Sequence, residues 1–410
     1  MMMKKVIPTI LVMLLVTSLL LFLGYFFLSN IQNEQEEFYV GVAFCGNTTQ
    51  EAKLLIDRVK DYTNLFVLQS GPISKNKTAI NEICDYAVSS DLDFIVFLGW
   101  FDFDHLWQVP WLDEAKDQWG DRFLGLYLYD EPGGIQIDHN WTDTFHYIET
   151  VFPELYATFE PYVEKDLTVP AMRDYSEATK RHIDYITRDL RVDELLNRSI
   201  TAITSDYALY WFDYLAGYDT VFVEIGWNHS TAKHIGLCRG AANAQNKDWG
   251  SIIVWNGRDE IDETSGNYKT GDEMLSDMKI SYQTGAKYVV IFNYPTYPGD
   301  NKYGILTDDH FVALETFWNY VHQNPNDYGV IKANTALVLP QDYGWGMRHP
   351  EDRIWGYWGS DELSLQIWNI TQLLLEEYGF ELDIVYNDPN FPIANKYETI
   401  YYWNQILSID

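Results

Sequence analysis

Basic residues are scarce in this chain. Its 410 residues include 28 Lys and Arg against 60 Asp and Glu, which leaves a formal net charge of -32 at pH 7. A surface with this excess of negative charge repels phosphate backbones and anionic lipid headgroups. We therefore exclude nucleic acid as a partner. Neutral partners such as carbohydrates remain compatible with the charge.

Cysteine is rare as well, and the common cofactor and nucleophile motifs are missing. Cys45, Cys84 and Cys238 have neither metal nor redox spacing, and an odd count argues against a disulfide framework. We interpret them as small buried apolar residues. No Gly-rich phosphate loop follows a strand-like run, and no Gly-x-Ser-x-Gly elbow is present. The sequence therefore disfavours nucleotide cofactors and serine hydrolysis, and we expect no cofactor.

The first apolar run is long enough to cross a bilayer. Lys4 and Lys5 precede an uncharged stretch from Val6 to Leu28, and a polar, acidic segment follows. About 20 apolar residues span a membrane as a helix, and positive residues favour the cytoplasmic side. We expect residues 1–30 to be a transmembrane signal-anchor, 31–37 a linker, and the main domains to be extracellular. A cleaved signal peptide is the alternative.

Several Asn-x-Ser/Thr triplets agree with an external location, provided that the host glycosylates secreted chains. The acceptor asparagines are Asn47, Asn76, Asn140, Asn197, Asn228 and Asn369. Because so short a pattern also arises by chance, its support is mild.

After the N-terminal segment, short β-branched or aromatic runs alternate with longer stretches of helical periodicity. This alternation is typical of βαβ units and a parallel sheet. Strands are expected at 39–45, 65–69, 94–100, 123–130, 200–206, 220–226, 251–256 and 288–294, and helices at 50–62, 79–89, 271–285 and 309–322. Eight such units within residues 38–330 predict an α/β protein whose main domain is a closed (β/α)₈ TIM barrel. The segment 133–199 exceeds one crossover helix and predicts two helices and a loop over one end of the barrel.

The pattern restarts near residue 334. Strands at 335–339, 382–386 and 399–403 and a helix at 363–378 predict a small α/β domain over residues 334–410. A unit of this size is near the lower limit for independent stability, so we expect it to lean on the barrel.

Acidic side chains stand at the ends of the fourth and sixth predicted strands, where a barrel of this type carries its active site. Alternation places one set of residues toward the outer helices and another set inside the barrel. The outer set is Leu124, Leu126, Leu128, Val221, Val223 and Ile225, and the inner set is Tyr127, Tyr129, Glu131, Phe222 and Glu224. We therefore expect Glu131 and Glu224 to converge at the carboxyl end of the barrel.

Two carboxylates across a pocket are what cleavage of a glycosidic bond needs. One protonates the departing oxygen, while the other attacks the anomeric carbon or activates water. Burial among aromatic rings would raise the pKa of the group that serves as the acid. We interpret Glu131 and Glu224 as catalytic; the alternative is that each is a structural carboxylate bonded to neighbouring hydroxyl or amide groups.

Two neighbouring carboxylates leave further alternatives open. A shift of one residue at the strand end would exchange Asp130 with Glu131 as the inward group, so Asp130 is kept as a supporting residue. Asp206 could take a substrate hydroxyl or cap a helix that begins near Ala208.

Aromatic and amide side chains gather at or just beyond the strand ends, where flat rings can stack on sugars and polar groups can bind hydroxyls. The expected substrate-binding residues are Trp100, Asp102, Tyr129, Asp130, Asp206, Trp227, Asn228, Trp255, Asn256, Asn293 and Tyr294, with Trp107 and Trp111 as further candidates. Any single tryptophan could equally belong to the core. His105, His229 and His234, with Asp102 and Asp104, lack the spacing of a metal site, so we expect no metal.

With Tyr129-Asp130-Glu131-Pro132 after the fourth strand and Glu224 in the sixth, the chain resembles the TIM-barrel glycoside hydrolases. In that superfamily the fourth strand often ends in a catalytic acid within an Asn/Asp-Glu-Pro setting. The C-terminal unit looks like the small flavodoxin-like domain of some β-galactosidase-type enzymes. Departures leave the subfamily open: the large retaining clan places its nucleophile after the seventh strand, where this chain has Trp255-Asn256-Gly257, and the chitinase-like motif is broken at Tyr127 and Tyr129.

The leading hypothesis is an anchored extracellular glycoside hydrolase with Glu131 as general acid/base and Glu224 as nucleophile or base, roles that could be exchanged. A non-catalytic glycan-binding or scaffold protein on the same barrel is the second, and a carbohydrate lyase or transferase the third. Carboxyl groups separated by about 5 to 10 Å would favour hydrolysis. Glutamates held in internal ion pairs would favour the scaffold.

Overall fold

The computed structural model describes residues 38–101, 103–139, 173–226, 229–254, 269–294 and 301–405, together with positions 150 and 153. The predicted signal-anchor and linker lie outside these residues. Among the helices that are described, none has the length and apolar character that a membrane span requires.

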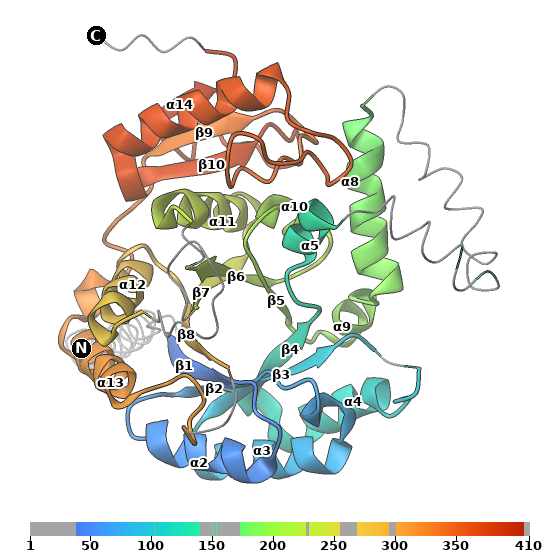
Figure 1. The fold of residues 1–410 in the computed structure, drawn as a ribbon, viewed down its shortest axis with the longest axis vertical. Helices are drawn as coiled ribbons and strands as arrows, with labels where there is room; N and C mark the ends of the chain where they lie inside the picture. The colour runs from blue at the N-terminus through green and yellow to red at the C-terminus, as the bar shows by residue number, and fades with distance from the viewer. Residues whose placement is uncertain are drawn as a thin grey trace, which may run out of the picture. The chain divides into compact units, whose positions relative to one another are not determined.

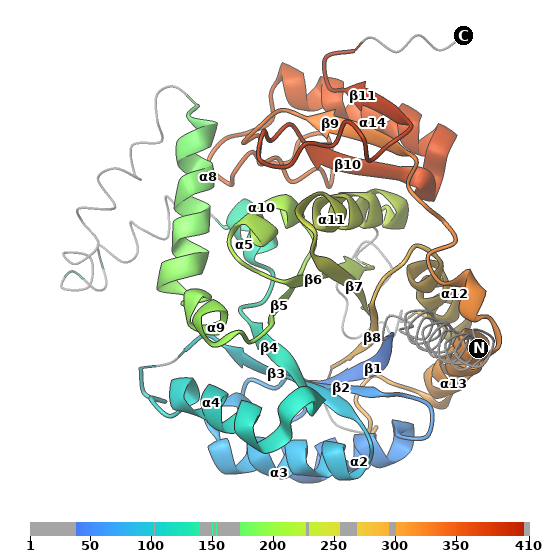
Figure 2. The ribbon, with the colours of Figure 1, turned by 180° about the vertical axis from the view of Figure 1, so that it is seen from behind.

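Eight parallel strands close into a barrel in chain order, and Figures 1 and 2 show them as a ring within the outer helices. The strands are β1 (Tyr39–Phe44), β2 (Leu65–Leu68), β3 (Asp93–Gly99), β4 (Phe123–Leu128), β5 (Ala202–Asp206), β6 (Thr220–Ile225), β7 (Asp248–Ile253) and β8 (Tyr288–Asn293). β8 pairs with β1 over six residues, which closes the ring. The predicted (β/α)₈ architecture is confirmed.

Helices connect the strands, and the insert between β4 and β5 is the longest connection. The helices are α2 (Thr49–Val59), α3 (Lys77–Ser89), α4 (Gln108–Trp119), α5 (Pro132–Asp138), α8 (Tyr175–Asp184), α9 (Asp193–Arg198), α10 (Tyr210–Leu215), α11 (Thr231–Gln245), α12 (Gly271–Gln283) and α13 (Asp308–Gln323). Local sequence defines several starts. Thr48, for example, accepts a hydrogen bond from the Glu51 N–H, while the Glu51 side chain accepts one from the Thr48 N–H, a reciprocal cap.

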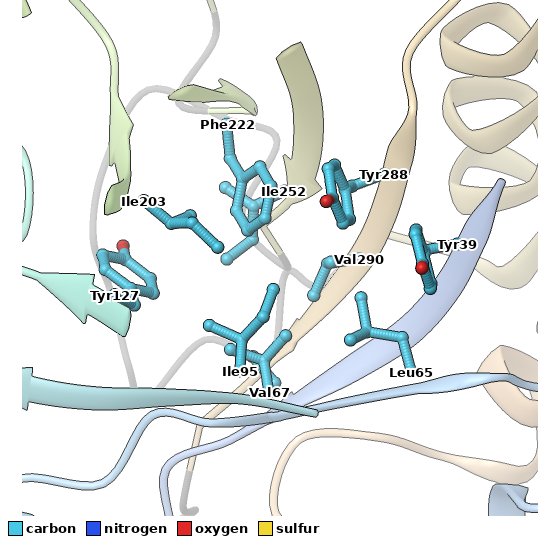
Figure 3. Close-up of a cluster of buried hydrophobic side chains, with 11 residues drawn as sticks. Tyr39, Leu65, Val67, Ile95, Tyr127, Ile203, Phe222, Ile252, Tyr288 and Val290 are labelled. Carbon is cyan, nitrogen blue, oxygen red and sulfur yellow. The ribbon is translucent and has the colours of Figure 1, made fainter. Parts of the chain in front are cut away.

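Apolar side chains fill the interior of the barrel (Figure 3). The interior cluster is Tyr39, Ala43, Leu65, Val67, Ile95, Tyr127, Ile203, Phe222, Ile252, Tyr288 and Val290. Tyr39 and Tyr288 stack with ring centroids 5.0 Å apart. Because apolar side chains fill the interior, a site for chemistry can lie only at the ends of the strands, where polar side chains replace the apolar layers.

The alternation predicted for β6 is confirmed, whereas that for β4 is wrong at its start. Phe222 lies in the interior cluster, and Val221 and Val223 are buried outside it. Leu124, expected toward the helices, instead packs against the interior cluster. The register between β3 and β4 shifts there, because Phe94 pairs with Phe123 while Ile95 pairs with Gly125. This bulge adds one residue and turns Leu124 to the other side.

A second sheet follows the barrel and uses one of the barrel's helices as a covering layer. Parallel strands β9 (Thr335–Leu339), β10 (Leu382–Tyr386) and β11 (Thr399–Tyr402) form it in the order β10-β9-β11, with α14 (Glu362–Tyr378) packed on β9 and β10. α11 packs against β10 as well as against β6 and β7, and it lies between the barrel and the small sheet in Figure 1. Residues 39–410 accordingly form one compact unit.

Two features of α11 make this close packing possible. A Cβ at Gly236 would lie 2.6 Å from the Leu382 carbonyl oxygen, so only glycine lets the helix approach β10 without displacement. One turn later, Arg239 donates a 2.8 Å hydrogen bond to Asp383, and both side chains are almost completely buried. The predicted contact between the C-terminal unit and the barrel is therefore part of the core.

Candidate active site

The backbone just after β4 breaks the regular alternation of the strand. Tyr129 and Glu131 have φ values of 59° and 53°, in the left-handed region that non-glycine residues seldom adopt. Neighbouring strands hold this conformation, because the Tyr129 N–H donates to the Gly99 carbonyl at 2.6 Å and the Glu131 N–H to the Ser205 carbonyl at 3.1 Å. Strained residues held by their surroundings gather at functional sites.

As a consequence, Asp130 and Glu131 both reach the same group of side chains. Sequence reasoning treated them as alternatives for one inward position, and that expectation is wrong. Together with Glu224 they form a set of three carboxyl groups at the carboxyl ends of β4 and β6, hereafter the carboxyl cluster.

Ser205 and Tyr127 link two members of the carboxyl cluster. Ser205 Oγ lies 2.8 Å from Glu224 Oε1 and 3.1 Å from Asp130 Oδ1, so its one hydroxyl proton bridges two carboxyl groups. Tyr127, labelled on β4 in Figure 3, donates its hydroxyl proton to Asp130 and lies 2.7 Å from Ser205 Oγ. These polar groups stand directly on the apolar interior of the barrel.

A hydrogen bond joins the carboxyl groups of Glu131 and Glu224. Burial, the charges of Glu224 and Asp130, and a hydrogen bond to Glu224 together raise the pKa of Glu131 from its ordinary 4.5 to about 10. Two carboxylates in contact cannot both ionise cheaply, so the pair retains a proton at neutral pH. A hydrogen bond between two acidic side chains is not the internal ion pair expected of a scaffold.

Asp130 is held in a different electrostatic state by its partners. Burial raises its pKa, and hydrogen bonds from Tyr127, Ser205 and Gln69 oppose that rise because they favour the charged form. The cluster thus combines Glu131, whose neighbours favour its protonated form, with Asp130, whose neutral donors favour its charged form.

Gln69, the residue after β2, is the part of this arrangement that sequence reasoning did not single out. Its Nε2 lies 3.5 Å from the Tyr127 hydroxyl, and its amide also bonds to Asp130. The sequence could have indicated Gln69, because it is a polar residue directly after a buried apolar strand. Ser205, two residues after the inward-facing Ile203, could likewise have been assigned by alternation.

Asp206 has a structural environment. Its completely buried carboxylate accepts hydrogen bonds from the N–H groups of Gly133, Gly134 and Ala208, at 2.5, 2.8 and 2.9 Å. Burial raises its pKa to about 6, and these N–H donors limit the rise. Asp206 is not the expected N-cap of a helix near Ala208, because α10 begins at Tyr210 and its N-cap is Leu209. The carboxylate instead holds the first turn of α5, directly after Glu131.

The C-terminal unit also reaches the end of the barrel. Arg348 pairs with Asp138 of α5 at 2.7 Å, and its guanidinium lies 5.5 Å from the centre of the Tyr207 ring. The Tyr207 hydroxyl donates to the same Asp138 at 2.7 Å. Burial raises the pKa of the Tyr207 phenol, and the charge of the nearby Glu131 adds to the rise. The segment between β9 and α14 thereby supports the loop that bears Tyr207.

The structure distributes the other predicted binding residues around this end of the barrel. Trp100 and Tyr294 are about half exposed, at 56% and 48%, as a stacking role would need. Asn293 is buried at the end of β8. Tyr129 turns toward the insert, where its ring packs edge-on against Tyr185 with centroids 6.3 Å apart, so it does not join the carboxyl cluster.

Some candidates are not placed by the structure, and others have core positions. Asp102, Trp227, Asn228, Trp255 and Asn256 lie outside the described residues. Trp111 is completely buried, with its Nε1 bonded to Asn81, and belongs to the core.

Histidines and cysteines near the barrel have packing environments. His229 stacks on His234 at 4.8 Å, and His234 is bonded to Tyr210. Within the described residues, no set of three or more His, Cys, Asp or Glu side chains has the geometry of a metal site. Cys84 and Cys238 are buried as predicted, while Cys45 is only half-buried.

Comparisons with known proteins identify no family. No family model and no curated protein matches the chain. Solved structures with a similar backbone include the endo-α-mannosidase from Bacteroides thetaiotaomicron, with 9% identity over 71% of this chain and 98% of that one and a TM-score of 0.42. The β-1,3-glucanosyltransferase from Rhizomucor miehei has 13% identity over 66% and 94%, with a TM-score of 0.39. Orotidine 5′-monophosphate decarboxylase from Methanocaldococcus jannaschii has 8% identity over 69% and 98%, with a TM-score of 0.33. Likenesses this distant leave the chemistry to be argued from the site.

Proposed function

We propose that the chain is a glycoside hydrolase whose general acid is Glu131 and whose nucleophile or base is Glu224. The observation that carries this proposal is the contact between the two carboxyl groups, which keeps a proton on Glu131 at neutral pH. An acid with a raised pKa beside a second carboxylate is the pairing that glycosidic cleavage uses.

In the proposed reaction a glycosidic oxygen enters between the two carboxyl groups and replaces Glu224 as the acceptor of the Glu131 proton. As the bond from the anomeric carbon to that oxygen breaks, the proton moves to the leaving oxygen. Glu224, now ionised and bonded to Ser205, attacks the anomeric carbon or removes a proton from an attacking water. The exposed rings of Trp100 and Tyr294 are suited to stack on sugar units outside the cluster.

The same contact supports a second candidate function. A carboxyl pair that bonds to itself could serve only to anchor the β4 and β6 ends in a non-catalytic glycan-binding protein. In that case the aromatic rings would bind sugar while Glu131 and Glu224 would be structural. Substitution separates the two functions, because binding without turnover does not need an acidic proton.

We further propose that residues 1–30 anchor the chain in a membrane with the barrel on the external side. The support is the uncharged run from Val6 to Leu28 behind Lys4 and Lys5. Among the acceptor asparagines that the structure describes, Asn47, Asn76, Asn197 and Asn369 are exposed, which is compatible with glycosylation. An external glycan substrate would suit this location.

The deciding experiment is turnover of a panel of aryl glycosides and natural glycans by the full-length chain in detergent. We expect Glu131→Gln and Glu224→Gln each to lower kcat by about 10³-fold or more, since each removes a group that acts in the transition state. Glu376→Gln, at an exposed position of α14, makes the same chemical change away from the site and should leave turnover unchanged. Glycan binding by the wild-type protein without turnover of any panel member would favour the binding protein.

A further inference from the structure

Negative charge and hydrogen-bond acceptors dominate the carboxyl cluster. Its bonded neighbours Tyr127, Ser205 and Gln69 are neutral. The largest influences on Glu131 are burial and the neighbouring acidic groups, all of which favour its protonated form. In the part of the chain that the structure describes, the repulsion between these groups is therefore relieved by a shared proton. A ligand that brings its own positive charge would relieve it equally well.

Gln69 supplies an independent indication of what this ligand must carry. Asp130 can only accept hydrogen bonds as a carboxylate, so the Gln69 amide must present its Nε2 to it. The other amide atom, Oε1, is buried and has no hydrogen-bond partner among the described residues, in a side chain that is 6% exposed. Buried acceptors are almost always satisfied, which indicates that a donor from a ligand belongs here.

Asn293 repeats this feature at the end of β8. Its side chain is 5% exposed, and its Oδ1 lacks a hydrogen-bond partner within the described part of the chain. Because all eight strands are parallel, the end of β8 lies at the same end of the barrel as the carboxyl cluster. Tyr288 and Val290 of the same strand face the interior, however, and Asn293 Oδ1 lies beside Gly304, so Gln69 is the residue that carries the argument.

We propose that Asp130 of the carboxyl cluster and Gln69 receive the ammonium group of an amino sugar, so that the substrate is a glycan with unacetylated amino groups. This inference rests on the proposed function and names its substrate class. An ammonium group offers three hydrogen-bond donors and a full positive charge, whereas a sugar hydroxyl offers one donor and no charge. Sugars with carboxylate or sulfate groups would meet repulsion and bind poorly.

The test is calorimetric binding of three defined oligosaccharides to the full-length chain in detergent at pH 6 and 0.3 M NaCl. The probes are a glucosamine tetramer, the corresponding N-acetylglucosamine tetramer and a galacturonate tetramer. We expect the glucosamine tetramer to bind at least 10-fold more tightly than its acetylated counterpart, and the galacturonate tetramer not to bind.

Variants separate a specific subsite from general attraction to an acidic protein. Asp130→Asn and Gln69→Leu should each reduce the preference for the glucosamine tetramer by about 10-fold. Glu376→Gln, which removes one exposed charge elsewhere, should leave it unchanged, and spermine should compete poorly. Retention of the native fold by each variant is checked by circular dichroism.

Each of the following binding results would overturn the inference. They are equal or tighter binding of the acetylated tetramer, a preference that survives both Asp130→Asn and Gln69→Leu, and displacement of the glucosamine tetramer by micromolar Ca²⁺, which would assign the cluster to a metal ion. Hydrolysis of acetylated or neutral glycans that Glu131→Gln abolishes would refute the inference and leave the hydrolase intact. Selective binding of the glucosamine tetramer without cleavage would support the inference about the ligand and refute the proposed hydrolase activity.

Discussion

Glu131 combines two unusual features, a left-handed backbone and a carboxyl group that keeps its proton. Its folded-state pKa, about 10, is above the ordinary 4.5. The stability that this shift contributes is fully present below about pH 4.5 and is lost as the pH rises toward 10, because the folded state then holds a proton that the unfolded chain has released. A site that costs stability at working pH is typical of function.

Glu131→Gln should therefore flatten the pH dependence of stability. The amide is neutral at every pH and keeps a donor for Glu224, so we expect its Tm to exceed that of the wild type by about 2 °C or more at pH 9. At pH 5 the Tm values of Glu131→Gln and the wild type should differ less than at pH 9. Thermal melts followed by circular dichroism from pH 5 to pH 9 measure this, with Glu376→Gln as the control. Parallel curves for Glu131→Gln and wild type would contradict the shifted pKa.

Tyr127 acts on the charge state of Asp130. Loss of its hydroxyl in Tyr127→Phe removes a donor to the carboxylate and should raise the pKa of Asp130 further. Hydrogen bonds to charged groups contribute about 1.5–3 kcal/mol, so the pKa of Asp130 should rise by about one unit, as measured by NMR titration of the labelled carboxyl carbon. Tyr218→Phe is a matched control, because that buried tyrosine donates to the Leu128 carbonyl instead. An Asp130 pKa that is the same in Tyr127→Phe and the wild type would show that the Tyr127 hydroxyl does not act on this carboxyl group.

At the scale of single residues, sequence reasoning found the participants of the site better than their geometry. Alternation placed Glu224 correctly, because β6 is regular. It could not show how Asp130 and Glu131 both join the cluster, since that depends on two left-handed residues, Tyr129 and Glu131, whose N–H groups donate to carbonyls of β3 and β5. Gln69 was overlooked because its role depends on a bond to the distant Tyr127.

At the scale of elements, the strands were predictable with good bounds, while the bounds of several helices were not predicted. β9 and β10 have the predicted bounds, and most barrel strands differ from prediction by one or two residues at an end. β7 begins three residues earlier than expected, because Asp248-Trp249-Gly250 does not have a strand-like composition. The eight predicted units imply a helix between the sixth and seventh strands, and α11 lies there. Its bounds could not be predicted, because it is buried on both faces and its sequence lacks the polar stripe that marks a surface helix.

The close approach of α11 to β10 gives a test of how the C-terminal sheet is attached. Gly236→Ala would place a methyl group 2.6 Å from the Leu382 carbonyl oxygen and force the helix and strand apart. We expect the free energy of unfolding to fall by about 1–3 kcal/mol. Gly359→Ala is the control, because no atom lies within 4 Å of its added Cβ. Urea denaturation of both variants measures the difference, and equal midpoints would mean that α11 does not pack so tightly on β10.

At the scale of the whole molecule, the net charge of -32 determines what can hold the chain at a membrane. Electrostatic adsorption to anionic lipid would be repulsive, so association has to come from apolar burial of the first residues. The full-length chain should therefore stay in the membrane fraction in 1 M NaCl and at alkaline pH. A chain lacking residues 1–37 should be soluble at every salt concentration, with an unchanged Tm. In intact cells, an added protease should digest the barrel from outside. Protection from that protease, or release of the full-length chain by salt, would contradict the anchored, external arrangement.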